Sequence, residues 1–223
     1  MSELPGYTVA PIQEDDVDEV MTLLKRTFFL DEPLNHAVGL CKSETDPCPE
    51  LEDYCSHSLL EGLSFKAIDS EGKIVGVIVN GVCPLKEEDG NDLLTQARNC
   101  QNPKFQRILY ILSRREEGAR LWERFPEDDK LVEIKVAATI PQWRRRGIMN
   151  VLVKETEEAT KQRGIRLVRL DTSSAYSAMS AERLGYTCVY TAPYKDIKMD
   201  GQPLIVPEPP HEHDCVYIKK LFD

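Results

Sequence analysis

Three consecutive arginines, Arg144, Arg145 and Arg146, stand directly before Gly147 in a chain whose formal net charge is −10. A strand-like apolar run precedes them, and a helical pattern begins directly after the glycine. The free N–H groups and the dipole of a helix start attract anions, and a glycine lets the backbone approach a phosphate closely. The turn therefore predicts a phosphate site. An exposed basic loop paired with acidic neighbours is the alternative that charge alone leaves open.

Carboxyl and hydroxyl side chains lie at two other breaks between predicted elements. Glu32 follows an amphipathic helical segment over 16–29 and precedes a proline, and its neighbour Asp31 has the same chemistry. Ser173 and Ser177 lie between a predicted strand and the first turn of a predicted helix. A carboxylate can accept a proton, and a hydroxyl can donate one or relay it through water. On position alone, a solvated carboxylate and helix-capping serines, with Ser177 favoured as the cap, stay open as alternatives.

The apolar periodicity predicts an α/β fold in which helices cover both faces of one mixed sheet. No internal repeat or linker divides the chain, so residues 1–223 are expected to form one domain. Strands are expected at 7–12, 64–68, 73–82, 131–139, 167–172, 186–191 and 215–221, helices at 16–29, 50–62, 93–98, 104–122, 148–163 and 177–184, a loop at 36–49 and an extended connection at 203–210.

The basic turn, Arg-x-x-Gly between a strand and a helix, resembles the acetyl-CoA pyrophosphate loop of the GNAT acetyltransferase superfamily. Residues 182–186, Glu-Arg-Leu-Gly-Tyr, resemble its closing element. More narrowly, residues 28–35 (Phe-Phe-Leu-Asp-Glu-Pro-Leu-Asn), 102–105 and 173–178 resemble motifs of insect-type arylalkylamine N-acetyltransferases. The resemblance covers essentially the whole chain. It implies a GNAT fold with a twisted, mostly antiparallel central sheet, and transfer of the acetyl group of acetyl-CoA to small amines of the dopamine, serotonin, octopamine and tyramine class.

The resemblance also implies roles for individual residues. Glu32 would be the general base, with Ser173 and Ser177 as its catalytic partners. A base is needed because a primary alkylammonium has a pKa of ~10.4, so about one molecule in 2,500 is neutral near pH 7. The residues implied to contact acetyl-CoA are Val136, Ala137, Ala138, Thr139, Arg144, Arg145, Arg146, Gly147, Ile148, Met149, Ser173 and Tyr176.

Two positions depart from the family pattern. Met149 stands where the superfamily usually has glycine or alanine, and its side chain either crowds the cofactor or packs under the helix. Ala181 stands where many GNAT enzymes have a tyrosine acid, which favours a serine, Tyr176 or a water relay as the proton donor. A longer acyl chain, a polyamine or another small amine, and a CoA-binding protein without turnover stay open as alternative functions.

The composition argues against several other classes of protein. An acidic chain repels the phosphate backbone of nucleic acids, so nucleic-acid binding is not expected. The seven cysteines are dispersed without a C-x-x-C pair, and the histidines of residues 211–215 have no second cluster to complete a ligand set, so no disulfide framework or metal is expected. Residues 1–5 carry no leader pattern, and no apolar run approaches the ~20 residues that span a bilayer. A cytoplasmic monomer without membrane contact is expected.

Overall fold

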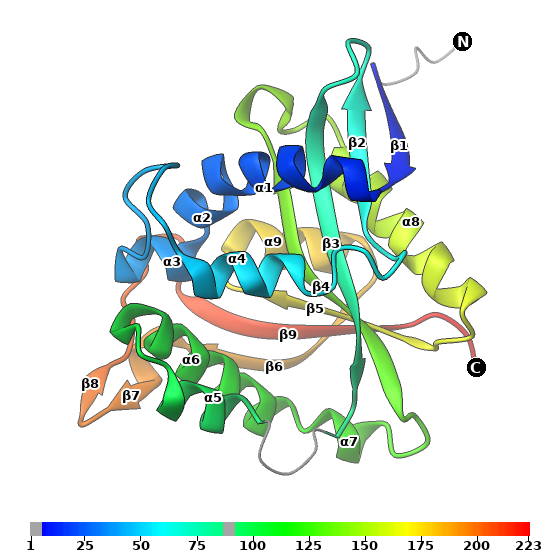
Figure 1. Ribbon diagram of the computed structural model, residues 1–223. Coiled ribbons are helices and arrows are strands. Elements are labelled where there is room, and N and C mark those ends of the chain that lie inside the picture. Colours follow the sequence, from blue (N-terminus) through cyan, green and yellow to red (C-terminus); the bar gives the residue numbers. More distant parts are fainter. Residues whose placement is uncertain (1–5, 87–91) are drawn as a thin grey trace.

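The computed structural model describes residues 6–86 and 92–223 and is built around a seven-stranded sheet (Figure 1). The strand order is β1-β2-β3-β4-β5-β9-β6, and every neighbouring pair is antiparallel except β4 and β5. The predicted mixed, mostly antiparallel sheet is therefore confirmed. The strands of this sheet are β1 (Tyr7–Pro11), β2 (Phe65–Asp69), β3 (Ile74–Pro84), β4 (Lys130–Thr139), β5 (Leu167–Thr172), β6 (Thr187–Pro193) and β9 (His213–Lys220), and β7 (Lys198–Met199) pairs separately with β8 (Gln202–Pro203).

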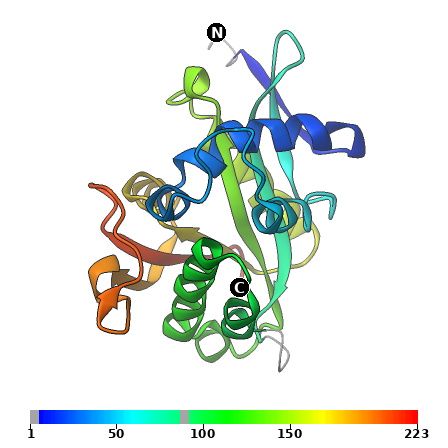
Figure 2. The same cartoon turned by 60° about the vertical axis from the view of Figure 1, so that its left-hand side comes forward.

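Helices cover both faces of the sheet, as predicted (Figures 1 and 2). On one face, α8 and α9 share a buried cluster with strand residues, to which they contribute Ile148, Leu152 and Ala181. The opposite face is covered by α1 to α4 and α6. The helices are α1 (Val17–Arg26), α2 (Phe28–Asp31), α3 (Pro33–Val38), α4 (Pro49–Ser56), α5 (Leu93–Asn99), α6 (Pro103–Ala119), α7 (Leu121–Arg124), α8 (Ile148–Gln162) and α9 (Ala175–Arg183), and the 3-10 turns are η1 (Glu14–Asp16), η2 (Pro141–Trp143) and η3 (Tyr194–Asp196).

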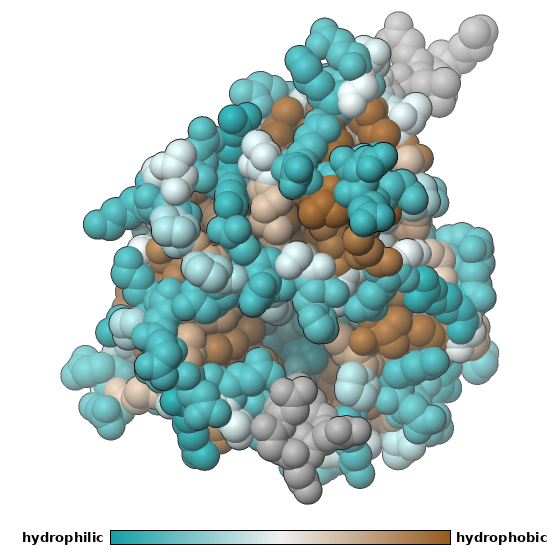
Figure 3. Space-filling model, viewed as in Figure 1, coloured by the Kyte–Doolittle hydropathy of each residue, from teal (hydrophilic) through white to brown (hydrophobic). Residues whose placement is uncertain are grey.

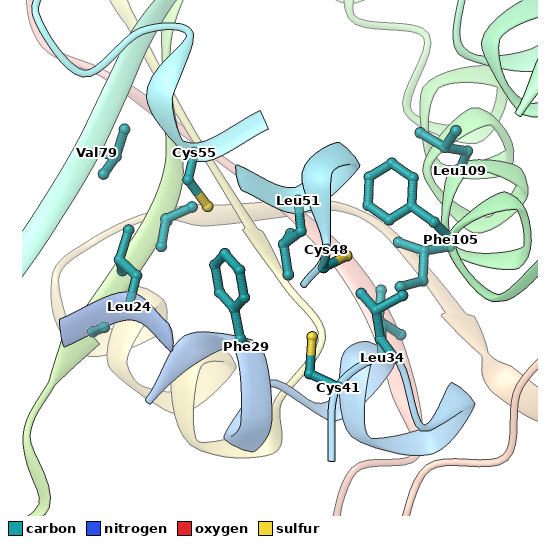
Figure 4. Packing of buried hydrophobic residues seen from close by; sticks show 14 of the residues in the cluster. Leu24, Phe29, Leu34, Cys41, Cys48, Leu51, Cys55, Val79, Phe105 and Leu109 are labelled. Carbon is teal, nitrogen blue, oxygen red and sulfur yellow. The ribbon is translucent and has the colours of Figure 1, made fainter. Parts of the chain in front are cut away.

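The core under α1 to α4 fixes the segment that carries Glu32. Phe29 and Leu34 are 1% and 3% exposed and pack among Leu24, Cys48 and other apolar side chains (Figure 4). Burying a side chain of this size contributes about 1.5–3 kcal/mol. Because one anchor precedes Glu32 by three residues and the other follows it by two, the intervening backbone has little freedom to move.

The two central strands separate along their length. β4 and β5 pair over Val132–Ile134 and Val168–Leu170, and no further pairing between them follows in the described chain. On its other side β4 stays paired with β3 as far as Thr139, with a bulge that leaves Lys135 without a direct partner. A bulge bends a strand and disrupts its ladder. The edge of β4 beyond Ile134 therefore presents backbone groups to a gap rather than to a strand.

Several predicted boundaries are wrong in detail. The helix predicted over 16–29 breaks at Thr27, whose backbone leaves the helical region and whose hydroxyl donates to the Leu23 carbonyl at 2.7 Å. The helix predicted over 104–122 breaks at Arg120, which adopts a left-handed conformation with φ of 47°. The predicted loop at 36–49 overlaps the end of α3. No helix among residues 6–86 and 92–223 is long and apolar enough to cross a bilayer; residues 1–5 lie outside the described residues.

Candidate active site

Glu32 is held by the start of a helix. It is the N-cap of α3, and its carboxylate accepts a hydrogen bond from the Asn35 N–H at 2.7 Å. Pro33 occupies the first turn, where its missing N–H costs nothing. The Asn35 side chain in turn donates to the Phe28 carbonyl at 3.2 Å, which ties α2 to α3. The break that the sequence predicted at Glu32 is thus a junction between two short helices.

The Glu32 carboxylate meets the Ser173 hydroxyl, although 141 positions separate the two residues in the chain. Burial raises the pKa of Glu32, while hydrogen bonds from Ser173 and the backbone and the charge of Arg115 act in the opposite direction. The net effect is a pKa above its ordinary value of 4.5. A carboxylate with a raised pKa is a stronger proton acceptor, so this environment suits a general base.

A buried tyrosine holds the backbone of Ser173. The Tyr194 hydroxyl donates to the Ser173 carbonyl at 3.1 Å and lies 3.5 Å from Asp214 Oδ1. Burial, and the negative charges of Asp214 and Glu32, raise the pKa of Tyr194, so its hydroxyl keeps its proton. Tyr194 is 3% exposed, so its hydrogen bond holds the backbone of Ser173 from within the core.

A buried ion network lies behind this tyrosine. The Arg115 guanidinium donates to Asp214 and, at 3.0 Å, to Asp171, and Arg169 donates twice to Asp171 and pairs with Glu116. Burial would raise the pKa of Asp171, but the charges of Arg169 and Arg115 hold it below its ordinary value. The network joins α6, β5 and β9 and places a fixed positive charge near Glu32.

Ser177 differs from its expected place. The N-cap of α9 is Ser174, whose Oγ accepts from the Tyr176 N–H at 3.1 Å, so the expectation that Ser177 caps this helix is wrong. The Ser177 hydroxyl donates to the Ser174 carbonyl at 2.9 Å. Tyr176 is 63% exposed and packs edge-on against His211. Of the two predicted catalytic serines, therefore, the structure brings Ser173 into contact with Glu32.

The arginine turn joins β4 to α8. Gly147, with φ of 78°, is the N-cap of α8, and no side chain caps the helix or adds negative charge to its first turn. The side chains of Arg144, Arg145 and Arg146 are exposed; Arg144 pairs with Asp31 at 2.6 Å, and Arg146 lies over the Trp143 ring. The first-turn N–H groups and three cations therefore face solvent together, an arrangement suited to a diphosphate.

The remaining predicted cofactor contacts fall into two groups. Ile148 is 2% exposed and Met149 is partly buried in the same cluster, so the Met149 side chain packs under the helix. Along β4, Val136 and Ala138 are buried and Thr139 is partly buried, whereas Ala137 is exposed in spite of its place in a central strand. Exposure at a central strand, next to the gap between β4 and β5, indicates a groove that a ligand chain could fill.

A cavity of about 810 Å³ opens on the face covered by α4 and α6, where Glu133 and Lys135 of β4 line it, and Figure 3 shows the hollow. Its lining includes Tyr54, Phe105 and Trp122, and it reaches Asp171 of β5. Alternate strand residues point to one face, so Ser173, just past the end of β5, follows the direction of Asp171. The cavity lining does not include Glu32 or Ser173. On β5, the lining residue closest in sequence to Ser173 is Asp171.

The sequence pattern of the acetyltransferase (GNAT) family matches residues 18–186. This chain belongs to the GNAT acetyltransferase family. It is similar to arylalkylamine N-acetyltransferase 2 of Aedes aegypti, with 27% identity and a TM-score of 0.91 over 97% of this chain and 99% of that one. It is also similar to a Drosophila melanogaster polyamine N-acetyltransferase that forms N-acetylagmatine, with 25% identity, a TM-score of 0.84 and 96% and 99% coverage. A mosquito arylalkylamine N-acetyltransferase-like protein 5b, at 20% identity, 96% and 99% coverage and a TM-score of 0.84, supports the fold alone.

The chain is therefore an N-acetyltransferase of the type that acts on amines, and its family uses acetyl-CoA as the co-substrate. The uncapped start of α8, the three exposed arginines and the exposed Ala137 fit that ligand. In the described residues no group of three His, Cys, Asp or Glu side chains could hold a metal ion, and His211 instead accepts from the Ala175 N–H at 3.2 Å.

The motifs did not point to Tyr194, Arg115 or Asp214. One signal was available for Arg115, since it lies at helical spacing from Ile108 and Leu112 and so continues an apolar stripe with a charge. A charged residue on a buried face needs a partner of opposite charge. The sequence contained no indication of which acidic residues those partners would be.

Proposed function

We propose that this protein transfers the acetyl group of acetyl-CoA to the primary amine of small arylalkylamines, with Glu32 as the general base and Ser173 and Ser177 as its partners. The observation that carries the proposal is the hydrogen bond between two half-buried groups, the Glu32 carboxylate and the Ser173 hydroxyl, near the carboxyl end of β5. Dopamine, serotonin, octopamine and tyramine represent the substrate class.

The proposed chemistry needs a neutral nucleophile. Glu32 takes a proton from the ammonium, directly or through water, and the amine nitrogen then forms a bond to the thioester carbonyl carbon. The nitrogen then gives up its second proton, the carbon–sulfur bond breaks and the amide leaves. Ser173, whose hydroxyl contacts Glu32, passes that second proton to the thiolate of CoA, and Glu32 releases the first proton to solvent. The register of β4 with β3 turns the Ala137 N–H towards the gap, where it could donate to the oxyanion that forms on the way.

Cofactor binding is assigned to the other predicted residues. Arg144, Arg145, Arg146 and Gly147 would hold the diphosphate, and the strand from Val136 to Thr139 would lie along the pantetheine arm. Ile148 and Met149 would contribute backbone groups, because their side chains pack into the core. Tyr176 is exposed beside His211 and is free to contact the cofactor.

The aromatic side chains of the cavity support an arylalkylamine substrate. Tyr54, Phe105 and Trp122 line it together with leucines of α5 and α6. Aromatic and aliphatic surfaces of this kind favour a ring over a hydrated, flexible chain. The similar Aedes aegypti protein, whose name specifies arylalkylamines, supports the same class.

A second candidate class is an aliphatic amine with an additional positive charge. Seven acidic and three basic side chains line the same cavity, which gives it a negative potential. The similar Drosophila melanogaster enzyme, named for polyamines and N-acetylagmatine, supports this candidate.

An assay of thiol release tests both candidates. Acetyl-CoA is supplied with phenethylamine, tyramine, dopamine, serotonin, agmatine, 1,5-diaminopentane and a lysine-containing peptide, and free thiol is followed over time. Turnover of the arylalkylamines but not the peptide is expected. Acetyl-CoA binding without release of thiol for any amine would overturn the proposal and indicate a CoA-binding protein.

A further inference from the structure

Four carboxylates of the cavity, Glu50, Asp53, Asp92 and Glu133, make no ion pair within the described residues, and of these Glu133 lies on a central strand, β4. Among the described residues, Asp171 and Glu116 pair with arginines, and Glu117 pairs with Arg114 at 2.8 Å, but no ion pair within 4.0 Å involves Glu133. The Glu133 carboxylate accepts a hydrogen bond from the Cys83 thiol at 3.3 Å. A thiol is a weak donor, so most of the acceptor capacity of Glu133 is left for another group.

The neighbouring cations are already engaged. Arg169 faces Glu133 across the parallel strands, but its guanidinium donates to Asp171 at 2.8 and 2.7 Å and pairs with Glu116. The Lys135 ammonium lies 5.8 Å from the centre of the Tyr54 ring. Neither cation therefore neutralises Glu133 through a direct contact.

Glu133 also lies a short way along β4 from the gap. It precedes the bulge in β4 by two residues, and Val136 follows the bulge at the gap, where the proposed mechanism puts the thioester. A strand rises ~3.3 Å per residue, so Glu133 lies roughly 7–10 Å from that gap. A small amine whose reacting nitrogen is at the gap can therefore place its opposite end beside Glu133.

We propose that Glu133 is a specificity-determining residue that binds a hydrogen-bond donor at the end of the substrate opposite its reacting amine. The donor is an ammonium, a guanidinium or a ring hydroxyl, and an ionised carboxylate accepts from all three. This inference rests on the proposed function and narrows its substrate class to amines with a donor at the distal end. Substrates whose distal donor is cationic are expected to bind most tightly, because the cation also neutralises the charge of Glu133.

Matched substrate pairs test the inference. kcat/KM is measured for 1,5-diaminopentane against pentylamine and for tyramine against phenethylamine, in the wild type and in Glu133→Gln. The diamine preference, the ratio of kcat/KM for 1,5-diaminopentane to that for pentylamine, is expected to fall about tenfold or more in Glu133→Gln, because a hydrogen bond to a charged group is the stronger one. The corresponding ratio of tyramine to phenethylamine should fall less, because the glutamine can still accept from a hydroxyl. Glu133→Asp, which keeps the charge, is expected to retain part of the diamine preference.

A control variant and two contrary results complete the test. Glu123→Gln removes a carboxylate that pairs with Arg120 outside the cavity, and it should leave both preferences unchanged. If Glu133→Gln melts like the wild type but loses activity equally on both members of each pair, or on neither, the inference is overturned while the acetyltransferase function stands. If the wild type releases no thiol with any amine, the proposed function itself is overturned.

Discussion

Replacing Glu32 with glutamine tests the chemistry most directly, because it removes the proton acceptor and little else. The glutamine oxygen can still accept from the Asn35 N–H, so the cap of α3 is kept. The raised pKa of Glu32 means that the folded protein binds its proton more tightly than the unfolded chain does. Above the unfolded pKa, the ionised carboxylate therefore costs stability, and Glu32→Gln is expected to melt at the same temperature or higher.

The expected loss of activity depends on pH. Without a base, the variant must use amine that is already neutral in solution, about one molecule in 2,500 near pH 7 for a pKa of ~10.4. Near pH 9.4 about one molecule in ten is neutral, an increase of roughly 200-fold. The wild type uses the ammonium form and has no such dependence between the pKa of Glu32 and that of the amine. We expect the variant to be at least ~100-fold slower in kcat/KM near pH 7, and its deficit to shrink about tenfold for each pH unit above that.

The assay is thiol release from acetyl-CoA with phenethylamine as the amine, measured from pH 5 to pH 9.5. In the wild type, kcat/KM should fall on the acid side as Glu32 is protonated, with a midpoint above the ordinary pKa of 4.5, and this limb should be absent from Glu32→Gln. Asp31→Asn is the matched control, since its carboxylate is half exposed and pairs with Arg144. A wild-type-to-variant ratio that is constant across pH, or a deficit below threefold, would show that Glu32 is not the proton acceptor.

Three further substitutions test the supporting structure. Tyr194→Phe should lower kcat by about tenfold and move the acid limb to higher pH, because loosening Ser173 removes a hydrogen bond that lowers the pKa of Glu32, and a pH–rate profile measures this. Arg144→Ala should raise the KM for acetyl-CoA about tenfold and leave the amine KM nearly unchanged in steady-state kinetics. Gly118→Ala should lower the melting temperature, since the new Cβ would lie 2.1 Å from the Tyr190 ring and overpacking of about 1–3 kcal/mol outweighs a helix-propensity gain of about 1 kcal/mol.

Each of these has a control and a contrary result. Ser173→Ala should move the acid limb in the same direction as Tyr194→Phe, and the double variant should show little further shift. Additive shifts in the double variant would show that Tyr194 does not act through Ser173. A rise in the amine KM for Arg144→Ala would place the diphosphate elsewhere. Gly6→Ala meets nothing within 4 Å and should be neutral, whereas Gly118→Ala in a Tyr190→Leu background should become stabilising if the ring is the cause.

Local physics made several features readable from the chain. The alternation of apolar residues predicted the strands, and helical spacing predicted α1, α6 and α8, because burial of one face imposes those periods. The turn at Arg144 to Gly147 could also be predicted from the sequence, for a different local reason. A glycine at the start of a helix and a run of cations create an anion site from residues that are adjacent in the chain. The proline after Glu32 predicted a break in the helical pattern there, but the role of Glu32 as a base came from the family resemblance of residues 28–35.

The local patterns do not specify which distant groups meet, and only the family resemblance paired Ser173 with Glu32. Ser173 contacts Glu32, and Tyr194 and Asp214 stand behind Ser173, only because β5 and β9 are neighbours in the sheet and α6 packs across them. The break at Thr27 likewise follows from packing, since Phe29 must enter the core while the chain changes direction. A periodic pattern records that a residue is buried but not what lies against it, so contacts between distant segments are decided by the tertiary structure.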